Sequence, residues 1–191
     1  MRALVAPNII HGAIESAFPG ERKRRLWRLD HLRDGVYLLL LSEDRPDLSH
    51  AAEQFGASAW ETVPYEPLLD RIERGSRWHF RLVANPTVSR SQGENKRGKI
   101  YAHSTVYYQR QWLLKKAEKN GFALEEDSFD VTKSQWFRFR KKEGGQMLSL
   151  LQVSYEGVLT VTDPEVFKKA LTEGIGREKA FGMGLLTIIG A

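Results

Sequence analysis

Cysteine is absent from the 191 residues, and so are long apolar runs and the spacings typical of metal ligands. Without cysteine the chain forms no disulfide bond and no thiolate metal site, which suits a reducing compartment. The longest apolar run, residues 36–41, is far too short to span a bilayer, and the N-terminus lacks signal-peptide architecture. The carboxylates are scattered, and no serine lies in a nucleophile elbow. We therefore expect a cytoplasmic protein that needs no metal ion or cofactor and does not associate with membranes.

Positive charge exceeds negative charge in this chain. There are 29 lysine and arginine residues against 24 aspartate and glutamate residues, which gives a formal net charge of +5. This balance favours a polyanionic partner, although many basic proteins bind no specific one. Hydrophobic residues make up 41% of the chain, enough for a folded core, and the length allows one large domain or two small ones.

A glycine-rich segment near the C-terminus reads GIGREKAFGMG and includes two basic residues, Arg177 and Lys179. Its four glycines are Gly174, Gly176, Gly182 and Gly184. It follows a helix predicted to begin at Asp163-Pro164 and precedes residues 185–189, which are predicted to form a buried final strand. A dinucleotide fingerprint would need glycine at position 179, and a P-loop would need Gly-Lys-Ser/Thr at 179–181. The segment therefore matches neither nucleotide motif, which leaves an anion-binding loop or a plain helix-to-strand connection.

The apolar periodicity predicts the β-α-β-β-α-β order of a ferredoxin-like domain over residues 1–88. Its expected elements are a strand at 2–6, a helix at 8–18, a hairpin of strands 26–32 and 36–41 turning at Asp34-Gly35, a helix at 49–55 and a strand at 77–84. The polar segment 89–99 is predicted to be a linker. Residues 100–191 follow a similar order, with strands at 100–102, 122–124, 134–140, 147–153 and 158–161 and helices at 106–119 and from Pro164. The expected fold class is α+β.

The segment GIGREKAFGMGLLTI resembles the C-terminal glycine-rich motif of the RAMP superfamily of CRISPR-associated RNA-binding proteins. It is most similar to the CasE-type endoribonucleases. Residues 155–161, 80–86 and 25–29 also resemble strands of this family, in family order, with 80–86 matching the end of the first domain. The resemblance implies two tandem ferredoxin-like (RRM-like) domains. It also implies an enzyme that cuts CRISPR repeat RNA and remains in the Cascade complex.

Metal-free cleavage of RNA needs a base for the 2′-hydroxyl, an acid for the leaving oxygen and positive charge for the phosphorane. Histidine suits either proton role. The five histidines are His11, His31, His50, His79 and His103. The resemblance places the catalytic histidine early in the first helix, which is the position of His11, as base or acid. Relatives commonly carry tyrosine three residues earlier, where this chain has Asn8. Asn8 could orient a phosphate or cap the helix, and we expect capping. Either the activity is slowed or the partner group comes from a different residue.

Two basic clusters and the glycine-rich segment supply candidate RNA contacts. The first cluster, directly after the first helix, is Arg22, Lys23, Arg24 and Arg25. It could supply charge at the cleaved phosphate or could be a solubilising loop. The second is Arg138, Arg140, Lys141 and Lys142, ahead of Gly144-Gly145. It resembles the family's basic hairpin along the RNA stem, and the alternative is a solvated hairpin tip. Arg177 and Lys179 are the expected phosphate contacts of the glycine-rich segment.

The expected function is therefore metal-independent cleavage of CRISPR repeat RNA (pre-crRNA) at the base of a stem-loop. The 2′-hydroxyl would attack, and the mature crRNA would carry a 2′,3′-cyclic phosphate and stay bound. Expected partners are the repeat stem-loop and other Cascade subunits. The alternative is a RAMP subunit that holds crRNA without cutting it, and a third interpretation is a general RNA-binding protein.

Overall fold

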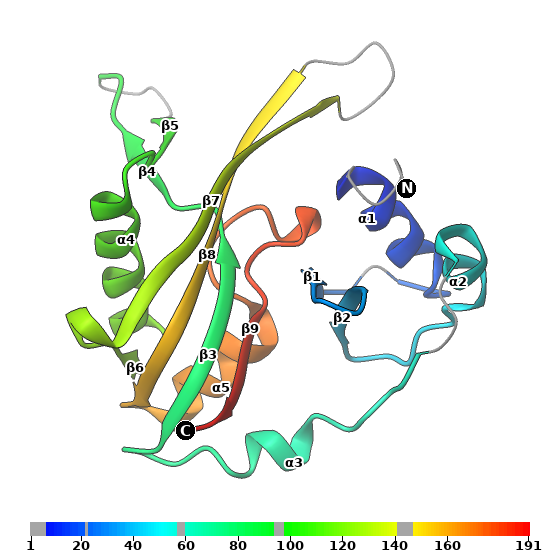
Figure 1. Cartoon of the computed structure of the whole chain (residues 1–191), viewed down its shortest axis with the longest axis horizontal. Coiled ribbons are helices and arrows are strands. Elements are labelled where there is room, and N and C mark those ends of the chain that lie inside the picture. The colour runs from blue at the N-terminus through cyan, green and yellow to red at the C-terminus, as the bar shows by residue number, and fades with distance from the viewer. Residues whose placement is uncertain (1–6, 22, 57–59, 94–97, 141–146) are drawn as a thin grey trace.

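The computed structural model describes residues 7–21, 23–56, 60–93, 98–140 and 147–191. The chain forms an α+β fold in which a long twisted sheet lies beside a smaller unit built from the N-terminal elements (Figure 1). Several sequence-based predictions lie outside the described residues: the strand at 2–6, Arg22, Lys141, Lys142 and the Gly144-Gly145 turn. Among the described residues, no helix has the length and apolar character needed to cross a membrane.

The larger unit is organised around the central strand β3 (Arg77–Ala84). It pairs antiparallel with β8 (Met147–Val161) on one side and with β9 (Leu186–Gly190) on the other. β8 also pairs with β7 (Phe129–Arg140) and with the short β6 (Phe122–Ala123). Buried residues of α4 (Val106–Lys119) and α5 (Pro164–Glu173) pack with this sheet in one core. The order β3-α4-β7-β8-α5-β9 is the β-α-β-β-α-β order of a ferredoxin-like domain.

The strand β3 belongs to the sheet of the larger unit. The strand forms as predicted at residues 77–84, but it does not close the N-terminal unit, because both of its edges pair with C-terminal strands. Nor are residues 89–99 simply a linker: β4 (Thr87–Arg90) pairs with β5 (Lys99–Ala102), and Arg90 lies opposite Lys99. Strand pairing is a contact between distant segments, which the order of elements along the chain does not determine. The pairing supports a division before β3 rather than at residue 88.

The smaller unit comprises α1 (Pro7–Ser16), the hairpin of β1 (Arg25–His31) and β2 (Val36–Ser42), and α2 (Ser49–Phe55). The two strands pair antiparallel around the predicted Asp34-Gly35 turn. Their core is formed by Ile10, Ile14, Ala17, Phe18 and Trp27. α3 (Glu66–Leu69) lies in the connection to β3, and the short helices η2 (Glu126–Ser128) and η3 (Lys179–Phe181) lie in the larger unit.

The start of α5 agrees with the prediction from the sequence, whereas the burial of β9 differs from it. At the start of α5, Asp163 caps the helix as predicted, since its Oδ1 accepts from the Val166 N–H at 3.2 Å. The final strand was predicted to be buried, but β9 is an edge strand of the described sheet. Leu186 is fully buried, whereas Ile189 is 70% exposed. An edge strand needs to bury only the part that faces the core.

The glycine-rich segment joins the two units. Gly182 has a φ of +76°, and a Cβ on it would lie 2.7 Å from the Trp27 ring of β1. A side chain at Gly174 would likewise collide with Leu26. Beside this contact, the buried Arg28 pairs with Asp30 at 2.8 Å and donates to the Leu185 carbonyl at 3.2 Å. Close backbone approach is what glycine permits. The segment between α5 and β9 is therefore the structural junction of the molecule.

Candidate functional site

His11 lies in an open hollow where α1, the segment before β1 and η3 meet. We call it the His11 pocket, and its volume is about 320 Å³. Its lining residues are His11, Glu15, Lys23, Arg24, Arg25, Lys179 and Ala180. Three groups of residues that are distant in the sequence thus come together here: the predicted catalytic histidine, the first basic cluster and the glycine-rich segment.

Glu15 links the histidine to the basic cluster. It lies one turn after His11 on α1, and its Oε1 is 3.9 Å from Nδ1 of the imidazole. Its Oε2 accepts a hydrogen bond from Arg25 Nη1 at 3.0 Å. The Arg25 guanidinium also lies 4.1 Å above the centre of the Phe18 ring, and its side chain is only 4% exposed. Arg25 was predicted to contact RNA, but its burial and its pairing fit the positioning of Glu15 instead.

The two other described members of the first cluster differ in their free charge. Lys23 pairs with Asp44 at 3.0 Å and with Glu43 at 3.4 Å, and the hydrogen bond to Asp44 raises its pKa. Its charge is therefore already compensated. Arg24 is exposed at the pocket and forms no ion pair within the described part of the chain. Of the described residues in this cluster, Arg24 is the one whose charge is available to a ligand.

Lys179 of η3 lines the same pocket as Arg24. Burial lowers the pKa of the Lys179 ammonium, and the positive charge of Arg24 lowers it further, while Glu173 acts in the opposite direction. The preceding residue, Glu178, has a φ of 62° and directs the chain into η3. A partly buried lysine near a second cation attracts an anion, because a negative charge relieves both the burial and the repulsion.

The second basic cluster reaches the same region through β7, which with β8 extends beyond the rest of the sheet (Figure 1). Arg138 and Arg140 are both exposed, as the predicted alternation requires. Between them, the Phe139 ring contacts the Phe181 ring of η3, with centroids 5.0 Å apart. The arginine-bearing strand is therefore packed against the glycine-rich segment that lines the His11 pocket.

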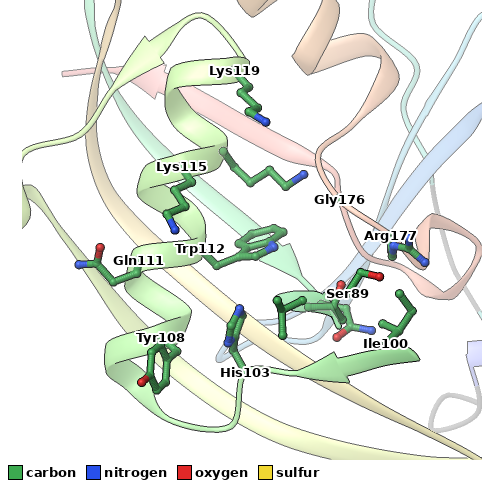
Figure 2. Close-up of a pocket in the computed structure, with 14 residues that line it drawn as sticks. Ser89, Ile100, His103, Tyr108, Gln111, Trp112, Lys115, Lys119, Gly176 and Arg177 are labelled. Atoms are coloured by element: carbon green, nitrogen blue, oxygen red, sulfur yellow. The ribbon is translucent and has the colours of Figure 1, made fainter. Parts of the chain in front are cut away.

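Arg177 does not line the His11 pocket. It lies with Gly176 at a second hollow of about 500 Å³, which we call the α4 pocket (Figure 2). The other lining residues are Asn85, Thr87, Val88, Ser89, Ile100, His103, Tyr108, Gln111, Trp112, Lys115, Lys116 and Lys119. The sequence analysis did not identify this site. A usable signal was the four-residue spacing of Gln111, Lys115 and Lys119, which places them on one face of a helix.

The remaining predictions can be placed briefly. Asn8 does not cap α1, because the helix already begins at Pro7; its Oδ1 is buried and has no hydrogen-bond partner among the described residues. His31, His50 and His79 are exposed and line neither pocket, whereas His103 lines the α4 pocket. In the described ranges, no three histidine or carboxylate side chains gather in a way that suits a metal ion. Glu15 lies within the predicted helix 8–18 but is not among the residues predicted for the site.

The described chain is an α+β fold with antiparallel sheets, and it places a histidine, a carboxylate and basic residues at the junction of its two units. The sequence profile of the family described as "CRISPR associated protein" matches residues 1–189, and the chain belongs to this family. The chain is 32% identical over 186 residues to the CRISPR-associated endoribonuclease Cse3 of Thermus thermophilus, covering 92% of this chain and 84% of that protein.

Solved structures agree with this family. The Thermus thermophilus Cse3 bound to an RNA representing a pre-cleavage complex matches with a TM-score of 0.84 and 30% identity, over 98% of this chain and 91% of that one. A chain of a CRISPR RNA-guided surveillance complex matches with a TM-score of 0.68 and 24% identity, over 97% of this chain and 90% of that one, which supports the fold. The predicted fold class, α+β with tandem ferredoxin-like domains, is confirmed by these matches.

Proposed function

We propose that the protein is an endoribonuclease that processes CRISPR repeat RNA, cutting the pre-crRNA at the base of a stem-loop. The observation that carries this proposal is the His11 pocket, where a histidine, a carboxylate and two cations converge at the junction of the units. The similarity to an enzyme named as a CRISPR-associated endoribonuclease, with a solved pre-cleavage RNA complex, supports the same activity.

In the proposed reaction the substrate supplies its own nucleophile. The 2′-hydroxyl oxygen forms a bond to the adjacent phosphorus while the bond from phosphorus to the 5′-oxygen breaks. One group accepts the 2′-hydroxyl proton, and another donates a proton to the departing 5′-oxygen, so the products are a 2′,3′-cyclic phosphate and a 5′-hydroxyl. No step requires a metal ion. His11 serves as one of the two proton-transfer groups, as the base or as the acid.

The residues around His11 have separate roles in this mechanism. Glu15, held in place by Arg25, would orient the imidazole, since its Oε1 lies 3.9 Å from Nδ1 of His11. Lys179 and Arg24 line the same pocket as His11 and would stabilise the additional negative charge of the phosphorane. A cation that is poorly solvated before the reaction gains most from charge that develops in the transition state, which suits the partly buried Lys179.

The exposed arginines of β7 would hold the RNA stem. A-form RNA offers phosphates and shape rather than base edges in its narrow major groove, so Arg138 and Arg140 would contact backbone phosphates along the strand. Gly174 and Gly182 let the connecting segment lie against Leu26 and Trp27 of β1, while Gly176 lies against Trp112 of α4. These close approaches would keep the stem contacts and the His11 pocket in a fixed relation. The product stem-loop would stay bound in the cytoplasm within a Cascade-type complex.

The test uses a synthetic repeat stem-loop from the array of the host, with protein in excess and EDTA present. A matched RNA carries one 2′-deoxy substitution at the nucleotide before the expected cut. We expect cleavage of the first RNA and none of the second, with a cyclic phosphate on the upstream product. Tight binding without cleavage of either RNA would contradict the enzyme assignment and favour a subunit that only holds crRNA. Equal binding of an arbitrary stem of the same length would contradict recognition of the repeat.

A further inference from the structure

The α4 pocket has the charge of an anion site. Four of its fourteen described lining residues are lysine or arginine, and none is aspartate or glutamate. Lys115 and Lys119 come from one face of α4, while Arg177 approaches from the glycine-rich segment (Figure 2). The electrostatics agree, because the pKa of His103 in the same pocket is lowered by burial and then by the charges of Lys115 and Arg90.

A free phosphate would not use everything that the pocket offers. Asn85 lines it, is only 5% exposed, and has an Oδ1 without a hydrogen-bond partner among the described residues. A buried acceptor of this kind calls for a ligand with a hydrogen-bond donor. A ribose 2′-hydroxyl or a base amino group supplies one, whereas a fully ionised phosphate does not.

Aromatic surface at the rim extends the same argument. The Tyr108 ring stacks on the His103 ring, with centroids 5.6 Å apart and an interplanar angle of 22°, and Tyr108 remains 55% exposed. Trp112 forms the floor, with Lys116 above its ring at 5.7 Å. A cationic groove combined with an accessible aromatic ring is the arrangement that binds unpaired nucleotides, since bases stacked inside a duplex do not reach such a ring.

The α4 pocket and the His11 pocket are connected through the glycine-rich segment. Arg177 lines the first and Lys179 lines the second, and their Cα atoms are at most about 7.6 Å apart by chain geometry. The two pockets are also close enough to interact electrostatically, because the charge of Lys116 in the α4 pocket contributes to the lowered pKa of Lys179. A strand of RNA leaving the His11 pocket therefore meets the α4 pocket next.

We propose that the α4 pocket binds single-stranded RNA that flanks the stem-loop next to the cleaved phosphodiester. Lys115, Lys119 and Arg177 hold its phosphates, Asn85 accepts a hydrogen bond from a ribose or base, and the exposed Tyr108 ring stacks on a base. The position relative to the cut rests on the function proposed above, whereas the preference for unpaired RNA rests on the pocket alone.

The test measures how much a single-stranded extension adds to binding. The RNAs are the 2′-deoxy stem-loop without an extension, with a short unpaired extension on its 5′ side, and with the same extension on its 3′ side. The protein variants are the double substitution Lys115→Ser/Lys119→Ser and, separately, Tyr108→Ala. The matched control is Lys168→Ser/Lys169→Ser. It also removes two positive charges, but from α5 and outside both pockets. Thermal melting verifies that each variant is folded.

We expect an extension on one side to tighten binding by the parent and by the control. In the lysine double variant, the ratio of the affinities with and without the extension should be smaller by a factor of about five. Its salt dependence for the extended RNA should fall by about 1.4 in slope, as for two lost phosphate contacts in single strands. The proposal is wrong if neither extension tightens binding, or if the double variant weakens the bare stem-loop by the same factor. If the extension gain is present but the unmodified stem-loop is not cleaved, the proposed function fails together with the position relative to the cut, whereas the binding of unpaired RNA by the α4 pocket stands.

Discussion

The two pockets beside the glycine-rich segment each contain a histidine and several basic residues, but among the described residues a carboxylate lines only the His11 pocket. His11 lies 3.9 Å from the carboxylate of Glu15. His103 lies instead near the charges of Lys115 and Arg90 and stacks on Tyr108. Burial and neighbouring cations favour the neutral ring of His103. The surroundings of each histidine, rather than the residue type, therefore distinguish the role that we propose for His11 from the role that we propose for His103.

Substitution of His11 tests the proposed contrast between the two histidines most directly. We expect His11→Ala to lower the single-turnover cleavage rate by about 10² to 10⁴, the usual cost of losing a general acid or base. Affinity for the 2′-deoxy stem-loop should change little, because the cations of the pocket remain. The measurement is single-turnover cleavage with protein in excess, alongside equilibrium binding.

The matched control is His79→Ala, which removes an exposed histidine that lines neither pocket. It should cleave like the parent. If His11→Ala also cleaves like the parent, the assignment of proton transfer to the His11 pocket is wrong. The contrast between the two histidines would then have no catalytic meaning.

A second substitution tests which cations act on the reaction rather than on binding. We expect Lys179→Ala to lower the rate at saturating protein by about 10² or more, the cost of losing one group that stabilises developing charge. Lys179→Arg should recover part of the rate, since it keeps the charge in an altered geometry. Lys169→Ala on the exposed face of α5 is the control for the loss of one positive charge. A loss of affinity alone, with the saturated rate unchanged, would mean that Lys179 only binds RNA.

The local features of this architecture could be predicted from the sequence. The bounds of α2, α4 and β3 follow the prediction, because helix periodicity, capping residues and strand alternation are properties of neighbouring residues. The partner of β3 could not be predicted, because the sequence of an apolar strand does not specify which distant strand it pairs with. For the same reason the sequence suggested a domain boundary after this strand, whereas the pairing supports one before it.

The His11 pocket could be predicted in part, and the α4 pocket could not. The family resemblance identified His11, and the basic residues after α1 were visible as a run, but a run does not reveal that Arg25 is buried on Phe18 while Arg24 is exposed. The α4 pocket collects residues from β4, β5, α4 and the glycine-rich segment, together with the residue after β3. No local pattern connects Asn85 to Arg177, so such a site becomes visible only in three dimensions.

The finest test of the comparison is the protonation of His103. Burial, and then the charges of Lys115 on α4 and Arg90 on β4, hold the pKa of its imidazole below the ordinary value. A lowered pKa in the folded state means that the unfolded chain binds the proton more readily. Stability from this group is therefore fully present above the ordinary pKa and is lost as the pH falls below it.

NMR titration of the imidazole protons, assigned with His103→Asn, should show the lowered value directly. Lys115→Ser should raise the pKa of His103. An RNA with the bound extension should raise it too, because phosphate in the pocket offsets the same positive charge. The bare stem-loop should leave this pKa unchanged. A pKa at or above the ordinary value in the free protein would show that the pocket lacks the positive potential on which its proposed ligand depends.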